Sequence, residues 1–288
     1  NSTDKFLLLI DDVRVYDTSP DLAAQAPVPA YTTPYARAPL GVDIVPTLAV
    51  TARNQGGVAL TNVVAVAEPR LDGATGGPAI TATAPLASLA VGASSALTFN
   101  APAAYSGAGT WTTKYTLSSD QSSSDGTPAN DTIEIPGVAI GGNELARWEG
   151  APSGTLGIGA GNGGELGVSF TIPADGWYAG GHFGADAIPP ETNGAPNTCP
   201  GFDYVLNLRE FDTTNNMPGA IVATTEPVAC EFDTAYSTDV AFVGGTRWLT
   251  AGTYVLTMAE PVGGMTVRLF LHDQRFVAGS TWVTWPTM

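Results

Sequence analysis

The sequence predicts an all-β protein made of two tandem antiparallel β-sandwiches with an extra N-terminal strand, and three observations support this prediction. Runs that alternate apolar and polar residues recur at strand length along most of the 288 residues, which is the period of half-buried strands. The chain contains 34 glycines and 22 prolines, which separate these runs and disfavour long helices. Apolar residues make up 44% of the chain, which is enough to fill two cores.

Residues 1–17 are expected to form a strand of a preceding or neighbouring domain. The run Phe6–Ile10 is apolar at every position, and valines then alternate with charged residues up to Tyr16. A strand that is apolar on both faces needs partners for its backbone groups and its side chains. It either completes a domain outside this chain or inserts into another copy by strand donation. The residues that would make this contact are Phe6, Leu7, Leu8, Leu9, Ile10, Val13 and Val15.

Residues 18–39 contain five prolines and are predicted to be an extended linker or a sheet edge. Proline fixes φ and withholds a ladder donor, so a central strand is disfavoured here. A turn or two of helix near Pro20–Gln25 is the most helix that we expect.

Residues 40–137 hold short alternating runs separated by turn formers such as Asn54–Gly57 and Asp72–Gly73. This density of strands is typical of an immunoglobulin-like sandwich. Trp111 is expected to be the aromatic residue that fills its core. The predicted strands cover residues 42–52, 60–67, 80–84, 95–99, 110–117 and 132–135.

Residues 138–288 begin with a glycine-rich segment, 150–164, and continue with a second set of strands that predicts a jelly-roll-like sandwich. Cys199 and Cys230 lack the spacing of metal ligands, and we interpret them as one disulfide in an oxidising compartment. Two free buried thiols are the alternative. The predicted strands cover residues 165–172, 177–183, 202–211, 220–225, 238–243, 252–258, 265–273 and 282–285.

Several stretches resemble modules of secreted and surface proteins from Bacteroidota-like bacteria. Residues 8–16, Leu-Leu-Ile-Asp-Asp-Val-Arg-Val-Tyr, resemble the last strand of MAM-like and cleaved-adhesin-type jelly rolls. The segment 54–63 is similar to the early hairpin of CARDB-like, Ig-like adhesion domains. The end of the same domain is resembled by residues 117–120 and 128–132. The β-sandwich that follows such domains resembles residues 164–170, 217–219 and 251–254. The resemblance implies an architecture but no catalytic residue, because these modules occur in proteases, adhesins and fibres alike.

The charge of the chain excludes nucleic acid as a partner and disfavours anionic membrane surfaces. The chain has 11 Lys and Arg against 27 Asp and Glu, which gives a net charge of −16. Nucleic-acid binding needs a basic footprint, and anionic membrane surfaces repel a chain of this charge. The run Phe6–Ile10 is too short for a membrane span or a signal core. Together with the cysteines, this composition indicates a secreted or cell-surface protein, and the start at Asn1 indicates a processed product or a piece of a longer chain.

One acidic loop is a candidate calcium site. Asp120, Asp125, Asn130 and Asp131 surround a turn rich in serine and glycine. Carboxylate and amide oxygens on flexible loops are the ligands that Ca²⁺ prefers, although the spacing does not match an EF-hand. A solvated acidic hairpin without metal is the alternative.

Large aromatic residues in the second half of the chain are candidate glycan contacts, because their ring faces suit the C–H groups of sugar rings. Packing between the two sheets is the alternative. The candidates are Trp177, Tyr178, Trp248, Trp282 and Trp285. Asn1 and Asn130 begin Asn-X-Ser/Thr sequons and are candidate glycosylation sites, with unmodified surface asparagines as the alternative.

No catalytic residue is assigned from the sequence. The two histidines, His182 and His272, are not accompanied by a metalloprotease motif or a nucleophile elbow. We therefore expect a non-catalytic extracellular structural or adhesion protein, with assembly into a surface fibre by strand donation as the sharper hypothesis. The alternative is a set of accessory modules that hold a larger secreted hydrolase or protease on its substrate. The expected partners are other copies or flanking domains, together with polysaccharide or a cell surface.

Overall fold

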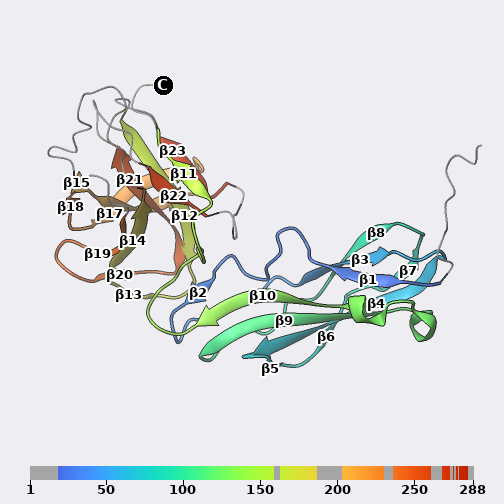
Figure 1. Cartoon of the computed structure of the whole chain (residues 1–288). Helices are drawn as coiled ribbons and strands as arrows, with labels where there is room; N and C mark the ends of the chain where they lie inside the picture. The colour runs from blue at the N-terminus through green and yellow to red at the C-terminus, as the bar shows by residue number, and fades with distance from the viewer. Residues whose placement is uncertain are drawn as a thin grey trace, which may run out of the picture. The chain divides into compact units, whose positions relative to one another are not determined.

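The computed structural model describes residues 19–158, 163–186, 203–229, 236–260, 268–272, 275, 277 and 279–284 (Figure 1). Among these residues the regular structure is β-strand, apart from two short 3-10 helices, η1 (Ser122–Ser124) and η2 (Pro128–Asp131). The strands form mainly antiparallel sheets arranged as sandwiches, so the predicted all-β sandwich class is confirmed. The described chain divides into two compact units. Unit 1 consists of residues 19–33, 45–105 and 109–137, and unit 2 consists of residues 34–44, 106–108 and the described residues from Val138 onward.

Unit 1 contains two sheets. The smaller sheet has the order β1–β3–β8, with strands β1 (Leu22–Gln25), β3 (Ala49–Asn54) and β8 (Ser94–Thr98). The larger sheet places β9 between β10 and β4, with three short strands paired to β4. Its strands are β4 (Leu60–Leu71), β5 (Ala74–Thr75), β6 (Ile80–Thr81), β7 (Leu86–Leu89), β9 (Gly109–Ser118) and β10 (Thr132–Ile140).

The core of unit 1 follows from the alternation along these strands. Val63, Ala65 and Ala67 on β4 are fully buried, and the residues between them are partly exposed. Tyr115 on β9 is fully buried in the same apolar cluster. Trp111 is buried as predicted, but it stacks on Tyr105 with ring centroids 4.9 Å apart. Tyr115, which the sequence reasoning did not single out, is therefore the aromatic residue of the main core cluster.

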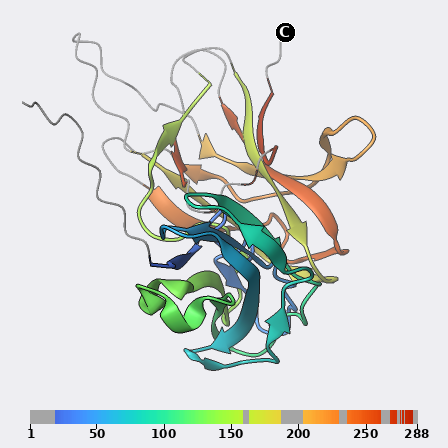
Figure 2. The same cartoon turned by 90° about the vertical axis from the view of Figure 1, so that its right-hand side faces the viewer.

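The segment near Pro20–Gln25 is a strand, and the prediction of a helical turn there was wrong. β1 pairs with β3 from Leu22 opposite Asn54 to Gln25 opposite Thr51. β1 is an edge strand with one partner strand. Its other side makes no ladder hydrogen bonds within the described residues, so neighbouring prolines, which lack an N–H donor, are tolerated there. Burial of Leu22 and Ala23 in unit 1 stabilises this arrangement over a local helical turn. Figures 1 and 2 both show the 3-10 helices beside this strand, and β1 contacts η2.

Unit 2 contains two larger sheets and two short two-stranded ladders. The larger sheets have the orders β17–β16–β21–β12–β23 and β11–β22–β14–β19, and β13 pairs β20 while β15 pairs β18. The strands are β11 (Gly154–Leu156), β12 (Gly164–Ile172), β13 (Gly176–Tyr178), β14 (Gly180–Ala185), β15 (Asp203–Tyr204), β16 (Leu206–Asp212), β17 (Met217–Thr224), β18 (Val228–Ala229), β19 (Tyr236–Ala241), β20 (Arg247–Leu249), β21 (Gly252–Glu260), β22 (Leu269–Leu271) and β23 (Thr281–Thr284). In addition, β2 (Arg37–Ala38) pairs in parallel with the end of β10.

Side chains from both larger sheets form the core of unit 2. Phe183 and Val240 from one sheet lie in a cluster with Leu206 and Met258 from the other. A second cluster includes Tyr254 together with residues of β12, β16 and β17. These contacts are those of a sandwich, in which apolar faces of two sheets pack together.

Two predicted strands of unit 2 are each divided in the structure. The strand expected at 177–183 is β13 and β14, which belong to different sheets and are separated by Ala179. The strand expected at 202–211 is β15 and β16, separated by Val205. In unit 1, the strand expected at 42–52 begins only at Ala49 because Pro46 lacks a ladder donor.

Several predictions lie outside the described residues. They concern the strand at 1–17 with its apolar residues 6–10, 13 and 15, and also Asn1, Cys199, Cys230 and Trp285. Within the described ranges, the structure has no helix with the length and apolar character that crossing a membrane requires.

Candidate functional site: an exposed tryptophan pair

Trp177 and Trp248 form an exposed aromatic pair in unit 2. They lie directly opposite each other on the antiparallel strands β13 and β20. Their ring centroids are 5.5 Å apart and the ring planes meet at 71°, an edge-to-face arrangement. The two residues are 67% and 53% exposed. Two neighbouring indoles exposed to this degree form an apolar surface, a feature that is typical of binding sites.

Local structure explains why these two side chains point outward. Leu249 is buried, and Trp248 precedes it on the opposite face of β20. The Asp175 carboxylate accepts a hydrogen bond from the Ala251 amide at 2.7 Å, which connects the segment before β13 to the segment after β20. The Arg247 guanidinium donates to the Val243 carbonyl at 2.8 Å. These two hydrogen bonds help to hold the ladder in place, and both rings remain exposed beside it.

The other predicted glycan contacts that the structure describes pack against protein side chains. Tyr178 packs against the core cluster that contains Tyr254, and burial raises the pKa of its hydroxyl. Trp282 on β23 lies against Phe211, with ring centroids 5.6 Å apart. Trp285 lies outside the described residues. Of the four candidates that the structure describes, only Trp177 and Trp248 are paired with each other at the surface.

The candidate calcium residues separate into two hydrogen-bonded groups within unit 1. The Asp120 carboxylate accepts hydrogen bonds from Thr61 at 2.8 Å and Asn62 at 2.6 Å. The Asp125 carboxylate instead accepts from the amides of Leu22 at 2.9 Å and Thr127 at 2.7 Å. Asp120 therefore belongs to a different group from Asp125.

Asp21, which the sequence reasoning did not select for this loop, joins Asp125, Asn130 and Asp131. Its carboxylate accepts a hydrogen bond from the Asn130 amide group at 2.9 Å. Burial raises the pKa of Asp131 to about 7, and the negative charges of Asp125 and Asp21 add to this effect. Across the described residues, no three carboxylate, histidine or cysteine side chains are already arranged to hold a metal ion.

His182 lies in a polar cluster on the paired strands β14 and β19. Its Nδ1 is 2.8 Å from the Asp239 carboxylate and its Nε2 is 3.2 Å from the Ser237 hydroxyl. The order of groups is that of a serine hydrolase triad. The Asp239 side chain is 90% exposed, however, and water screens the charge that would orient and stabilise the imidazole. We therefore assign this cluster to cross-strand pairing.

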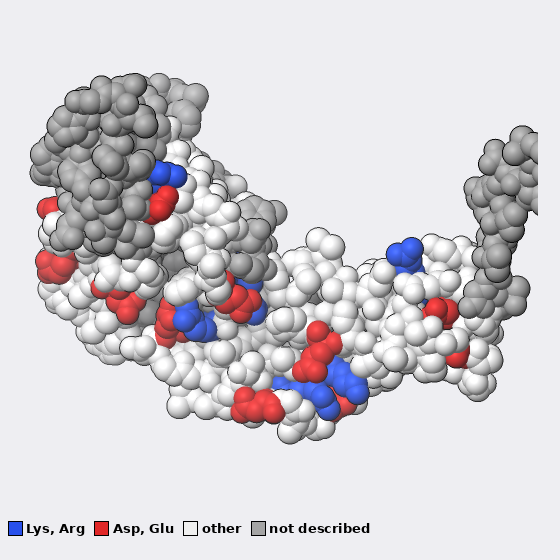
Figure 3. Space-filling model, in the orientation of Figure 1, with Lys and Arg blue, Asp and Glu red and all other residues white. Residues whose placement is uncertain are grey.

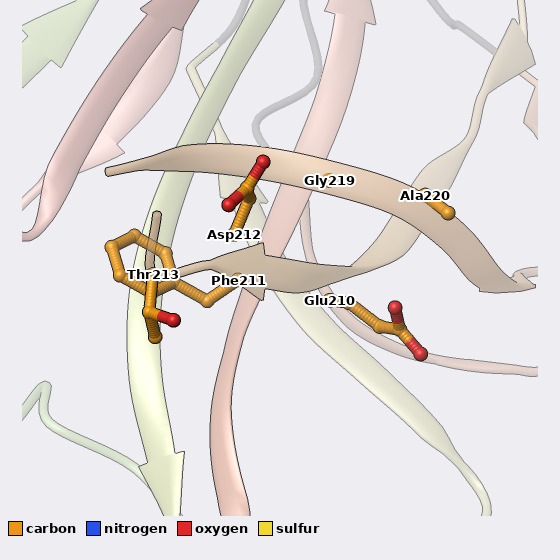
Figure 4. Close-up of a pocket in the computed structure, with 6 residues that line it drawn as sticks. All are labelled: Glu210, Phe211, Asp212, Thr213, Gly219 and Ala220. Atoms are coloured by element: carbon orange, nitrogen blue, oxygen red, sulfur yellow. The ribbon is translucent and has the colours of Figure 1, made fainter. Parts of the chain in front are cut away.

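A shallow hollow of about 350 Å³ lies at the β16–β17 hairpin (Figure 4). The Asp212 carboxylate accepts hydrogen bonds from the Asn215 side-chain amide and from the backbone amides of Asn215 and Thr214, and these bonds lower its pKa. Its carboxylate is therefore part of the hairpin turn. Glu210 points away from Asp212 in Figure 4, so the hollow does not present a facing pair of carboxylates. The remaining lining residues are Phe211, Thr213, Gly219 and Ala220.

Most described arginines of unit 2 are paired with carboxylates. Arg209 binds Glu165 through two hydrogen bonds of 2.8 and 2.7 Å. Three further pairs join Arg37 to Glu144, Arg268 to Asp186 and Arg275 to Glu149. Figure 3 shows several basic side chains beside acidic ones on the face in view. These contacts neutralise much of the small positive charge, so the excess of acidic residues sets the long-range field of the surface.

Comparisons with protein-family models, curated proteins and solved structures found no match to this chain. The functional proposal therefore depends on the chain's own geometry and charge.

Proposed function

We propose that this chain is a non-catalytic extracellular structural and adhesion protein whose unit 2 contacts polysaccharide through Trp177 and Trp248. The observation that carries the proposal is the cross-strand tryptophan pair, with both indoles more than half exposed. The core clusters of unit 2 are filled by other side chains, including Phe183 and Tyr254. The two exposed rings are therefore available for a ligand.

Polysaccharide is the ligand that best fits this surface. The electron-rich face of an indole attracts the slightly positive C–H groups that line one face of a sugar ring. Because Trp177 and Trp248 meet at 71°, they offer two differently tilted surfaces. Such a pair suits a chain of successive sugar rings better than one flat ligand. The net charge of −16 favours neutral or basic glycans over acidic ones.

Assembly into a surface fibre is the second part of the proposal and concerns residues outside the described ranges. It is supported by the apolar run at residues 6–10, whose side chains need partners. Light scattering on the full chain and on a version that lacks residues 1–17 tests it. Assemblies in the full chain that disappear in the shorter one are expected, and monomers in both samples would rule out strand donation.

The tryptophan pair equally favours the alternative of accessory modules for a larger secreted enzyme. In that case the pair would hold a hydrolase or protease on an insoluble substrate. The two functions differ in what flanks this chain. Catalytic sequence in the same precursor would favour the accessory role, and its absence from a complete precursor would favour the adhesion role.

Retention on insoluble polysaccharides tests the contact surface directly. The wild-type chain, Trp177→Ala and Trp248→Ala would be incubated with chitin, cellulose and a bacterial cell-wall preparation. We expect retention of the wild type by at least one of them and roughly two- to tenfold weaker binding for each variant, since one aromatic contact contributes roughly 0.5–1.5 kcal/mol. Ile221→Ala is the matched control, because Ile221 is an apolar residue of unit 2 that is 48% exposed. Equal retention of all four proteins would reject Trp177 and Trp248 as the contact site.

A further inference from the structure

Unit 1 buries the carboxylate of Asp131 without giving one of its oxygens a hydrogen-bond donor. Asp131 is 8% exposed, and its Oδ1 has no hydrogen-bond partner in the structure. An ionised carboxylate in such a position is strongly unfavourable, and proteins relieve it with a paired charge, a metal ion or a proton. Asp131 therefore needs an occupant at this oxygen.

The groups around Asp131 supply further oxygens and negative charge. The neighbouring charges that act on it are those of Asp125 and Asp21. Asn130 adds a second unpartnered oxygen, because its Oδ1 is buried without a donor while its amide nitrogen donates to Asp21. Two orphaned oxygens and two further carboxylates thus lie in one part of unit 1, where a cation would relieve both the repulsion and the missing contacts.

We propose that Asp131, Asn130, Asp125 and Asp21 form a calcium site that joins the start of β1 to the loop carrying η1 and η2. All four side chains offer oxygen, which hard divalent cations prefer. Ca²⁺ accepts six to eight oxygens in irregular geometry, and water would complete its shell. Mg²⁺ demands a near-ideal octahedron, to which two loop segments from distant parts of the chain are poorly suited.

The site is not preformed, and this explains why no three acidic groups already surround a common point among the described residues. The Asp125 carboxylate accepts hydrogen bonds from the backbone amides of Leu22 and Thr127, and the Asp21 carboxylate accepts one from the Asn130 side chain. Calcium would draw these carboxylates towards Asp131 and exchange some of these bonds for metal contacts. Because Asp125 already contacts Leu22 of β1, binding is expected to tighten the edge strand onto the loop.

The test is a comparison of thermal unfolding with calcium and with EDTA at about pH 8, where Asp131 would otherwise be ionised. At about 10 mM Ca²⁺, roughly ten times the weakest dissociation constant usual for extracellular calcium modules, we expect the melting temperature of unit 1 to rise by roughly 5 °C. Mg²⁺ at the same concentration should produce a smaller rise. Hydrogen exchange should slow at residues 19–25 and 119–131.

Two isosteric variants locate the effect. Asp131→Asn should abolish the calcium response, because the amide removes a charged ligand. Asp120→Asn is the matched control, since Asp120 lies in the same loop but binds Thr61 and Asn62, and it should keep the full response. Isothermal titration of the wild type should give one site per chain.

Three results would overturn the proposal. The first is an identical melting temperature in calcium and EDTA for the wild type. The second is a calcium response that survives Asp131→Asn, which would place the ion elsewhere. The third is stabilisation by acid alone, without calcium binding in the titration, which would mean that a proton is the only occupant of Asp131. The site lies in unit 1, so none of these results depends on the tryptophan pair of unit 2.

Discussion

Unit 1 and unit 2 both bury aromatic side chains, and unit 2 in addition exposes two tryptophans. Tyr105, Trp111 and Tyr115 of unit 1 are all buried, whereas Trp177 and Trp248 of unit 2 are more than half exposed. The core of unit 2 is filled by other aromatic side chains, including Phe183 and Tyr254, together with aliphatic residues. Aromatic content alone therefore does not distinguish a residue that packs in the core from one that is free to contact a ligand. The two kinds of residue are distinguished by their position in the strand and by the sheet face from which the side chain projects.

The largest loss of stability is expected from truncating Tyr115, the buried aromatic residue in the main core cluster of unit 1. Tyr115→Ala should lower the free energy of unfolding by about 3–5 kcal/mol, because it leaves a cavity in the main core cluster. Tyr115→Phe should cost about 1 kcal/mol, since it removes only the hydroxyl that accepts a bond from the Ala49 amide. Denaturant unfolding measures both. A loss for Tyr115→Ala no larger than that for Tyr115→Phe would show that the ring does not fill the core.

The next largest loss of stability is expected from breaking an ion pair in unit 2. Its partly buried carboxylate is paired with an arginine, whereas Asp131 of unit 1 lies near other carboxylates. Glu165 on β12 and Arg209 on β16 form a two-bond ion pair, with side chains about one-fifth exposed. Arg209→Met should cost about 2 kcal/mol of stability, because Glu165 keeps its charge without a partner. Adding Glu165→Leu should recover most of that loss. Denaturant unfolding of both variants checks this, and no recovery in the double variant would mean that Arg209 acts through other contacts.

Asp131 of unit 1 should make stability depend on pH when calcium is absent. Its pKa in the folded state is about 7, above the ordinary value of 3.8, so the folded state holds more protons than the unfolded state between these values. Stability should therefore fall as the pH rises from about 4 to about 7 and change little from this group above that. Melting temperatures in EDTA buffers would show the slope. Asp131→Asn should flatten it, and an unchanged slope would assign the dependence to other groups.

The smallest effect on stability is expected at the exposed pair. Trp177→Ala and Trp248→Ala should each change the free energy of unfolding by no more than about 0.5 kcal/mol, because their rings contact water more than protein. The same denaturant curves as for Tyr115→Ala provide the measurement. A loss comparable to that of Tyr115→Ala would show that these indoles serve the fold.

Strands whose pattern is local were predicted well from the sequence. The strand expected at 110–117 is β9, Gly109–Ser118, because alternation is visible without knowledge of its partners. β1 was not predicted, since its stability comes from pairing with β3 and from burying Leu22. The break at Ala179 was also missed, because β13 and β14 continue one apolar pattern and differ only in the sheet that they join.

The candidate sites show the same limit. The sequence marks Trp177 and Trp248 as large aromatics, but their exposure follows from the register of β13 with β20. Asp21 lies far from Asn130 in the chain, and its carboxylate reaches Asn130 because β1 contacts η2. The sequence showed that Asp120 and Asp125 share a loop, and only the folded hydrogen-bond pattern separates them. Residue chemistry was thus predictable, and the grouping of residues across strands was not.

The most direct test of the central claim is a titration of tryptophan fluorescence with soluble fragments of the retained polysaccharide. It would compare the wild type with the double variant Trp177→Ala/Trp248→Ala, after denaturant unfolding has shown that both are equally stable. We expect saturable quenching or a blue shift in the wild type and no saturable change in the double variant. Equal affinity of the two proteins, measured by calorimetry on the same samples, would contradict the claim that this pair is the contact surface.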